Sequence, residues 1–108
     1  MLERDIERIF VNAVKDAGGY AYKFTSPGND GVPDRIVCLP DGLTIFVELK
    51  TARGKLTKLQ EKQIDRLNSL YQPVCVLYGL RDVIDFLEEY DMPEQAARLE
   101  RRYVEGED

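Results

Sequence analysis

Two short apolar runs joined by a Pro-Asp-Gly turn at residues 40–42 constrain this chain more than any other stretch. Runs of this kind around such a turn are typical of a β-hairpin. Hairpin pairing brings the start of the first strand beside the end of the second, so we expect Asp34 to lie near Glu48. Because strand side chains alternate between the two faces, Lys50 shares a face with Glu48. Two carboxylates and an ammonium group are therefore predicted to converge at one end of a small sheet, an arrangement that suits a divalent metal acting on a phosphate ester.

The rest of the chain alternates between helical and strand-like periodicity. In order, we expect a helix at 2–17, strands at 20–25, 34–39 and 43–50, a helix at 57–70, a strand at 73–78, and helices at 81–90 and 91–103. This α-β-β-β-α-β-α order with an added C-terminal helix predicts an α/β fold in which helices flank a small mixed β-sheet.

The C-terminal half contains further local signals. Residues 73–78 form an apolar run bounded by proline and glycine, so we expect a strand that is buried on both faces. Asp91 is expected to be the N-cap of the last helix, with Pro93 just inside it. We assign residues 1–90 to the core domain and residues 91–108 to a C-terminal helix and acidic tail.

The residue inventory narrows the possible chemistry. The chain contains no histidine, which removes the usual general base and the triads that need an imidazole. Cys38 and Cys75 lie in separate apolar runs, and we expect buried free thiols rather than a disulfide or metal ligands. No apolar run approaches the roughly 20 residues of a membrane span, and the charged N-terminus is unlike a signal peptide. These features predict an intracellular protein whose chemistry uses carboxylates, lysine, hydroxyls or a metal.

The charge of the chain is unevenly distributed. The formal net charge is −5, yet the segment from Lys50 to Arg66 carries six basic and two acidic side chains. A local basic patch binds phosphates even when the whole chain is acidic. The alternative is an ordinary solvated helix face.

Each candidate residue has a structural alternative when it is taken singly. Asp34 can simply begin a strand, and Glu48 with Lys50 can form an exposed pair on an edge strand. Three apolar residues precede Glu48 without a break, however, and they indicate an interior strand where a carboxylate needs a partner or a metal. Gln60 also fits a capping box with Thr57, and the two roles can be combined.

The constellation as a whole resembles the VRR-NUC family of the PD-(D/E)XK nuclease superfamily. The match reads Gly31-Val32-Pro33-Asp34, then Glu48-Leu49-Lys50 starting 14 positions after Asp34, then Gln60 in the next helix and a glutamate in the first helix. Ser26-Pro27-Gly28 also looks like the small phage and bacterial members. The resemblance covers residues 3 to 88.

This resemblance implies a Mg²⁺- or Mn²⁺-dependent endodeoxyribonuclease. Asp34 and Glu48 would ligate the metal, together with the backbone carbonyl of Leu49. Magnesium bound to a protein keeps several water ligands, so these few ligands from the protein are sufficient. Lys50 would orient the attacking water or neutralise charge on the phosphate.

The resemblance implies supporting roles for residues in the two neighbouring helices. Gln60 would position the site from the helix that follows the hairpin. A glutamate of the first helix would hold the outer waters of the metal, and Glu7 is preferred to Glu3 because its spacing to Gly18 fits related junction-cutting enzymes. On local pattern alone, Glu7 reads as an exposed residue of a charged helix.

The same resemblance implies DNA as the partner. Arg53, Lys55 and Lys58 would contact backbone phosphates beside the site, and the loop that begins at Ser26 would approach DNA from the other side. The negative net charge of the chain fits recognition of branched DNA, such as a four-way junction or a flap. The resemblance also implies a homodimer similar to Holliday junction resolvases. The expected location is the cytoplasm of a bacterium or phage-infected host. The alternatives are a non-catalytic module that binds branched DNA and retains the nuclease fold, and a protein-interaction domain.

Overall fold

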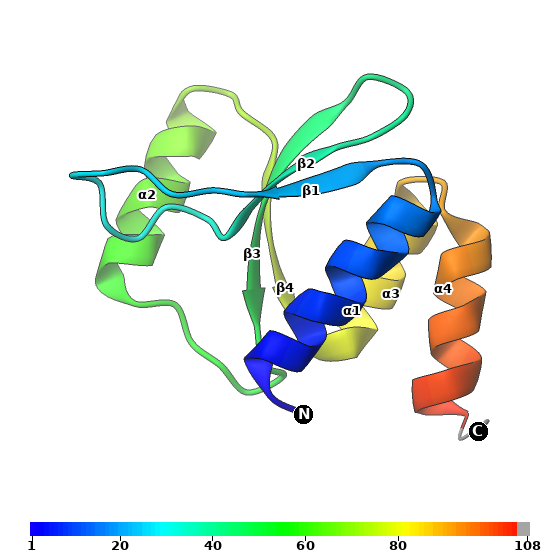
Figure 1. Cartoon of the computed structure of the whole chain (residues 1–108). Coiled ribbons are helices and arrows are strands. Elements are labelled where there is room, and N and C mark those ends of the chain that lie inside the picture. Colours follow the sequence, from blue (N-terminus) through cyan, green and yellow to red (C-terminus); the bar gives the residue numbers. More distant parts are fainter. Residues whose placement is uncertain (106–108) are drawn as a thin grey trace.

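The computed structural model describes residues 1–105 and has the predicted α/β architecture (Figure 1). In chain order its elements are α1 (Glu3–Asp16), β1 (Tyr20–Lys23), β2 (Arg35–Cys38), β3 (Thr44–Lys50), α2 (Lys58–Ser69), β4 (Val74–Tyr78), α3 (Gly79–Glu89), α4 (Pro93–Leu99) and a closing π-helical segment, η1 (Glu100–Val104). This order confirms the α-β-β-β-α-β-α prediction with its added C-terminal helix. The end of the predicted acidic tail, residues 106–108, lies outside the described residues.

The four strands form one mixed sheet in the order β1-β2-β3-β4. β1, β2 and β3 pair antiparallel, whereas β3 and β4 pair parallel. β3 is therefore an interior strand, as the apolar run before Glu48 indicated. β4 lies at an edge of the sheet, and Leu77 alone among its residues is buried. The expectation that this strand is buried on both faces was wrong, because an apolar run does not distinguish an edge strand with one neighbour from a central strand with two.

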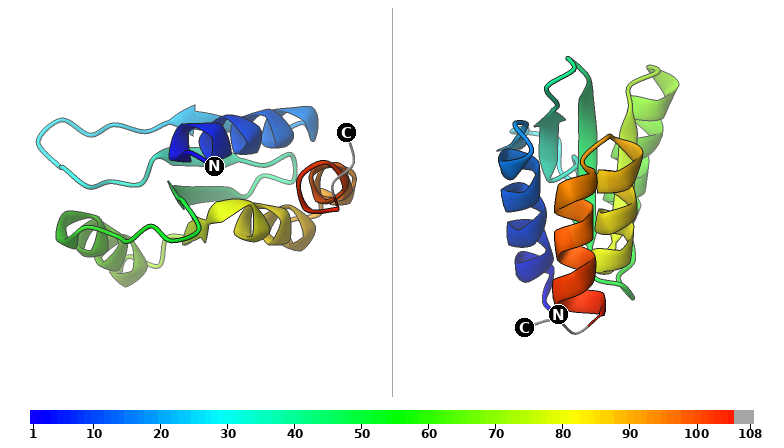
Figure 2. Two further views of the ribbon diagram at one scale, coloured as in Figure 1. Left: turned by 90° about the horizontal axis from the view of Figure 1, so that it is seen from below. Right: turned by 90° about the vertical axis from the view of Figure 1, so that its right-hand side faces the viewer.

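The core lies between the sheet and one layer of helices. α1 and α3 cover one face of the sheet, and α2 lies against the other (Figure 2). The apolar residues of α1 form one buried stripe, and Phe10 packs edge-on against Phe86 of α3 with ring centroids 5.4 Å apart. α2 has no fully buried residue, and Leu59 and Leu70 remain exposed. The first face therefore supplies most of the burial that stabilises the fold.

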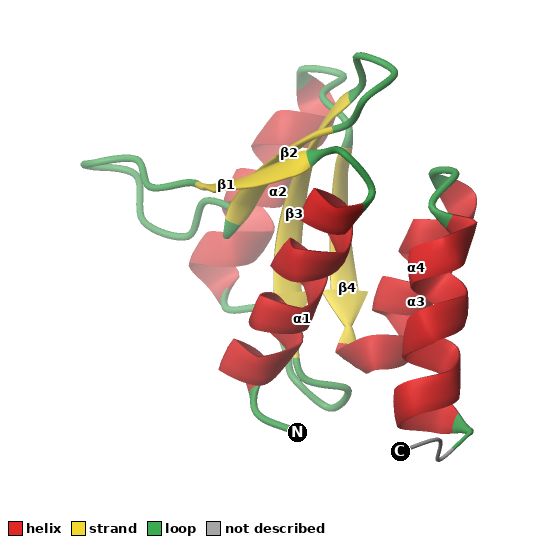
Figure 3. Ribbon diagram, turned by 45° about the vertical axis from the view of Figure 1, so that its right-hand side comes forward, coloured by secondary structure: helices red, strands yellow, loops and turns green. Residues whose placement is uncertain are grey.

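The C-terminal helix extends this core. α4 packs on the outer side of α1 and α3 (Figure 3), and Met92, Ala96 and Leu99 are buried there. The N-cap of α4 is Met92 rather than the predicted Asp91, whose backbone is left-handed with φ of 62°. Pro93 occupies the first turn as predicted, so the residue directly before it takes the cap position. The helical segment continues through η1 to Val104.

Both cysteines are free, and each is half-buried rather than fully buried. Burial raises the pKa of the Cys75 thiol to about 12, which keeps it in the unreactive thiol form at neutral pH. Among the described residues, no helix combines the length and apolar character required to cross a bilayer.

Candidate active site

The hairpin brings Asp34 and Glu48 together. Arg35 pairs with Val47 across β2 and β3, so the register places Asp34, one residue before the strand, opposite Glu48. Asp34 Oδ2 accepts a hydrogen bond from the backbone N–H of Leu49 at 3.0 Å. This contact holds the aspartate against the end of the interior strand.

Glu48 is a buried carboxylate, with 1% of its surface exposed. Its Oε2 accepts a hydrogen bond from Gln60 Nε2 at 3.1 Å and lies 3.9 Å from Lys50 Nζ. Its Oε1 is buried, and no donor among residues 1–105 gives it a hydrogen bond. A buried, unpaired carboxylate oxygen is costly, and it marks the point in the site where a cation would be most stabilising.

The electrostatics of the site follow from this geometry. Burial raises the pKa of Glu48 to about 8, and the negative charge of Asp34 acts in the same direction. Lys50 opposes the shift, and the charge of Glu3 adds to it. Because the Lys50 ammonium group is beyond hydrogen-bonding distance from Oε2, it offsets the burial of the carboxylate only in part.

Gln60 performs both of the roles that its position suggested. Its Oε1 accepts a hydrogen bond from the Thr57 N–H at 2.9 Å, and its own N–H donates to Thr57 Oγ1 at 3.1 Å, completing a capping box. Its Nε2 remains free to donate to Glu48. A carboxamide has both an acceptor and a donor, so one side chain can begin α2 and contact the site.

Gly31 allows α2 to approach the turn that carries Asp34. Its φ is 89°, a left-handed conformation that favours glycine. A Cβ at this position would lie 2.6 Å from the Leu59 carbonyl carbon, in the first turn of α2. The glycine of the Gly-Val-Pro-Asp turn is therefore required by a close backbone approach.

The two candidate glutamates of α1 lie in different surroundings. Glu7 Oε2 accepts a hydrogen bond from Arg35 Nε at 3.1 Å. Arg35 and buried Val37 are two residues apart, so they share the face that α1 covers, which is opposite to the face of Glu48. Glu3, by contrast, is close enough for its charge to raise the pKa of Glu48. Figure 1 shows the first turn of α1 at the same end of the molecule as the end of β3.

The structure therefore does not bring Glu7 to the Asp34–Glu48 pair, contrary to the sequence-based preference for it over Glu3. Helical periodicity places Glu3 and Glu7 one turn apart on α1, but it does not determine which turn reaches the end of β3. The Glu7–Arg35 ion pair was not anticipated. The side-chain period of two was the available signal, because it places Arg35 on the opposite face from Asp34.

The predicted DNA-contacting residues lie in two segments, the loop before β2 and the segment from the end of β3 to the first turn of α2. Arg53, Lys55 and Lys58 are exposed in the segment that leaves β3 and enters α2, and no carboxylate of the described residues forms an ion pair with them. Ser26 is half-buried, and its Oγ accepts a hydrogen bond from Asn29 Nδ2 at 3.0 Å within the loop before β2. The basic side chains are thus available to an external anion.

The side chains at the site fit a hard divalent cation with a large share of water ligands. Within the described part of the chain, no group of three or more His, Cys, Asp or Glu side chains is arranged to hold a metal. Asp34 and Glu48 each engage one oxygen with a protein donor, and the buried Oε1 of Glu48 has none. Two carboxylates and several waters suit Mg²⁺ or Mn²⁺ better than Ca²⁺, which takes more oxygen ligands.

Comparison with solved structures shows that this α/β fold, with a carboxylate pair, a lysine and a glutamine at one end of its sheet, is that of a VRR-NUC nuclease. A structure described as "VRR_NUC domain" superposes with a TM-score of 0.74 and 28% sequence identity, covering 82% of this chain and 96% of that one. A second, described as "VRR_NUC domain protein", has a TM-score of 0.66 at 19% identity, covers 83% of this chain and 88% of that one, and supports the fold.

Sequence comparison finds a relative that is also described as a nuclease. Over 75 residues the chain is 49% identical to "Putative nuclease p44" of Acyrthosiphon pisum secondary endosymbiont phage 1, covering 69% of this chain and 81% of the phage protein. A search with family models finds no match. The chain belongs to the VRR-NUC family of nucleases.

Proposed function

We propose that this VRR-NUC protein is a metal-dependent, structure-selective DNA endonuclease that hydrolyses phosphodiester bonds. The observation that carries the proposal is the buried Oε1 of Glu48, to which no donor of the described residues gives a hydrogen bond, in a carboxyl group whose pKa Asp34 helps to raise. A purely structural site would be expected to satisfy this atom. A cation would satisfy it and stabilise both carboxylates.

Asp34 and Glu48 would hold a Mg²⁺ or Mn²⁺ ion, with the Leu49 carbonyl as the third protein ligand. Such an ion lowers the pKa of bound water and neutralises charge on a phosphate. The hydrogen bonds from the Leu49 N–H and from Gln60 orient the two carboxylates before any substrate arrives. The protein thereby supplies a site whose geometry is already set.

Lys50 would stabilise negative charge that develops on the phosphate. It shares the face of Glu48, and its side chain is 11% exposed. An ammonium group in such a poorly solvated position interacts with an anion more strongly than one in open water. Lys50 can also hold the attacking water in line, since its protons are not fully engaged by Glu48.

For the carboxylate of the first helix we propose Glu3 rather than Glu7. Glu7 is committed to Arg35, whereas the charge of Glu3 acts on Glu48. Glu3 would accept hydrogen bonds from the outer waters of the metal. Glu7 would act through Arg35, which is adjacent to Asp34, and would therefore position the site without touching the metal.

We propose DNA as the substrate, with a branched form such as a four-way junction or flap preferred. Arg53, Lys55 and Lys58 are exposed cations next to the site that pair with no carboxylate of residues 1–105, and phosphate contacts of this kind carry no sequence information. The longest dimension of the chain is 43 Å, so a homodimer would suit a two-fold branched substrate better than a single copy. The phage origin of the 49% identical relative favours action in the cytoplasm of a bacterial or phage-infected cell.

The test is cleavage of four-way junction, flap, single-stranded and linear duplex DNA with Mg²⁺, Mn²⁺ or EDTA. The wild type should cut a branched substrate only when metal is present, and Asp34→Asn and Lys50→Ala should lose that activity. Asp65→Asn, which removes an exposed acid of α2, should retain it. Binding of the junction without cleavage under any condition would instead support a non-catalytic binding module. Sedimentation of the free protein tests the homodimer.

A further inference from the structure

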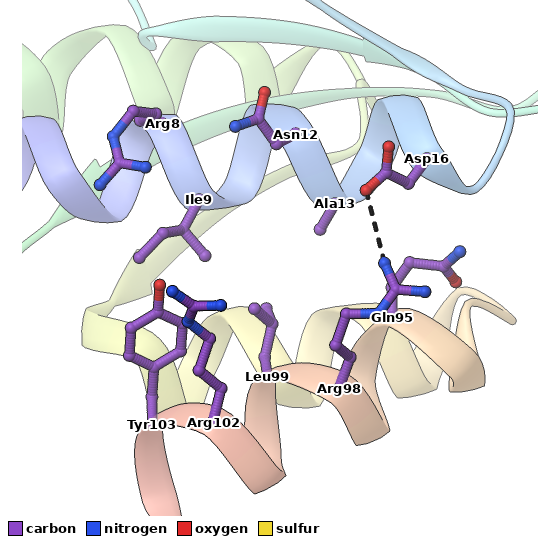
Figure 4. A pocket seen from close by; sticks show the side chains of 10 residues that line it. All are labelled: Arg8, Ile9, Asn12, Ala13, Asp16, Gln95, Arg98, Leu99, Arg102 and Tyr103. Carbon is purple, nitrogen blue, oxygen red and sulfur yellow. Dashed lines mark ion pairs between the residues drawn. The ribbon is translucent and has the colours of Figure 1, made fainter. Parts of the chain in front are cut away.

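A second basic surface lies between α1 and the C-terminal helical segment (Figure 4). A groove of about 270 Å³ opens there, and three arginines line it from the two sides: Arg8 of α1, and Arg98 and Arg102 of α4 and η1. Asn12, Gln95 and Tyr103 add further polar groups along it, and Asp16 adds one carboxylate. We call this feature the arginine groove.

The charges in the arginine groove are only weakly neutralised by the protein. Arg8 lies 3.8 Å from Asp5 and Arg98 lies 3.6 Å from Asp16, both beyond hydrogen-bonding distance and with exposed or half-exposed side chains. Arg102 stacks over the Tyr103 ring at 5.6 Å from its centroid. Among the described residues, no carboxylate forms an ion pair with Arg102.

The floor of the groove is apolar. Ile9, Ala13 and Leu99 line it and are buried. Guanidinium groups above an apolar floor are less fully hydrated than groups in open water, and their forked N–H donors match the oxygens of a phosphate. The chemistry of the groove therefore suits a phosphate better than a cationic or neutral ligand.

The arginine groove and the Asp34–Glu48 site lie on opposite sides of the sheet, because Glu48 contacts Gln60 of α2 whereas the groove lies between α1 and α4. At 100° per residue, Glu7 falls on one side of the buried stripe of α1, and Arg8 and Asn12 fall toward the other. One flank turns toward β2, where Glu7 meets Arg35, and the other turns toward α4 (Figure 4). A straight duplex that lies along one side of the molecule does not follow the other.

We propose that the arginine groove binds the backbone phosphates of a DNA arm other than the arm that is cut. This inference rests on the proposed function, because it assumes a DNA substrate at the Asp34–Glu48 site. A branched DNA sends its arms in different directions from one point, so it can contact both sides of the sheet. The groove thus gives a physical basis for preferring branched over linear DNA in a chain whose net charge is −5.

The decisive experiment compares the Arg8→Ala/Arg102→Ala double variant with wild type and with Lys15→Ala. Lys15 is exposed on α1 but does not line the groove, so it controls for loss of a positive charge from the same helix. Binding to a four-way junction and to a linear duplex of equal length is measured by fluorescence anisotropy in EDTA, over a series of salt concentrations. Circular dichroism checks that each variant is folded.

The double variant should bind the junction at least roughly tenfold more weakly, the loss expected from even one charged hydrogen bond. For the junction, the slope of the logarithm of the binding constant against the logarithm of the salt concentration should decrease in magnitude by about 2. This is close to 0.9 for each phosphate contact removed. Binding to the linear duplex should stay unchanged, as should junction binding by Lys15→Ala. Junction cleavage with Mg²⁺ should show a raised KM at an unaltered kcat.

Three results would overturn the proposal: unchanged junction binding, an equal loss for junction and linear duplex, or a change in sedimentation that identifies the groove as an interface between copies of the chain. The proposed function fails separately. If the wild type cuts no DNA with any metal while the double variant loses junction binding selectively, the proposal for the groove is supported and the nuclease assignment is rejected. If the double variant binds and cuts like wild type, the proposal for the groove is rejected and the nuclease assignment is supported.

Discussion

Gln60 Nε2 donates a hydrogen bond to Glu48 Oε2 over 3.1 Å, and this contact joins the first turn of α2 to the buried end of β3. The same side chain accepts from the Thr57 N–H in the capping box. The start of a helix and the orientation of a candidate metal ligand therefore depend on one residue. Changes at Gln60 can separate these two functions.

Gln60→Glu should keep the capping box and disrupt the site. A glutamate can still accept from the Thr57 N–H, but it replaces the donor to Glu48 with another carboxylate. We expect a loss of about 1–3 kcal/mol in the free energy of unfolding at pH 8, with a smaller loss at pH 5, where the carboxylates are more protonated. Urea unfolding at both pH values measures this. An equal loss at the two pH values would mean that the cap, not the contact with Glu48, dominates.

Glu48 should make the metal-free protein less stable as the pH rises. Its pKa is raised from 4.5 to about 8 in the folded state, so between these values the folded chain holds a proton that the unfolded chain has released. Stability from this group is complete below about pH 4.5 and is lost as the pH approaches 8. Glu48→Gln, which does not titrate, should lack this component and be the more stable protein at pH 8.

Thermal unfolding in EDTA across pH 4.5 to 8.5 measures the difference in stability between wild type and Glu48→Gln. The titrations of all other groups largely cancel in this difference. Saturating Mn²⁺ should restore wild-type stability, by about 2.7 kcal/mol at one hundred times the dissociation constant, and should leave Glu48→Gln nearly unaffected. Parallel pH profiles for the two proteins would contradict the assigned environment of Glu48.

Glu3 and Glu7 should respond differently to removal of their charge. Glu7→Gln weakens the partly exposed ion pair with Arg35 and should cost about 1 kcal/mol of stability. Glu3→Gln should leave stability nearly unchanged but weaken Mn²⁺ binding roughly tenfold, as loss of an outer-sphere partner does. Calorimetric titration with Mn²⁺ and urea unfolding measure both effects, with Glu61→Gln of α2 as the control. If Glu7→Gln instead weakens Mn²⁺ binding and Glu3→Gln does not, Glu7 is the glutamate that acts on the metal.

Gly31→Ala should destabilise the fold more than Gly28→Ala does. Both glycines have positive φ, at 89° and 81°, so an alanine at either position costs about 1–2 kcal/mol of backbone strain. A Cβ at Gly31 also meets the backbone of Leu59, whereas a Cβ at Gly28 has no atom within 4 Å. We expect Gly31→Ala to lose at least about 2 kcal/mol more than Gly28→Ala in urea unfolding. Similar losses would show that α2 can move away from the turn.

Much of the site was predictable because it depends on local rules. The Pro-Asp-Gly turn and the two apolar runs define a hairpin, the hairpin register sets Asp34 opposite Glu48, and the period of two places Lys50 on the same face. Thr57 and Gln60 have the spacing of a capping box. Each of these relationships is determined by residues that are close in sequence or directly paired.

The tertiary structure alone decided the relationships between distant elements. The edge position of β4, the left-handed Asp91 before α4, and the meeting of Glu7 with Arg35 depend on how helices and strands pack, as does the arginine groove between α1 and η1. Periodicity gives the apolar stripe of a helix, but the position of that helix along the sheet is set by long-range packing of many side chains. The sequence by itself therefore determined which groups form the carboxylate pair, and packing determined which glutamate and which cations surround it.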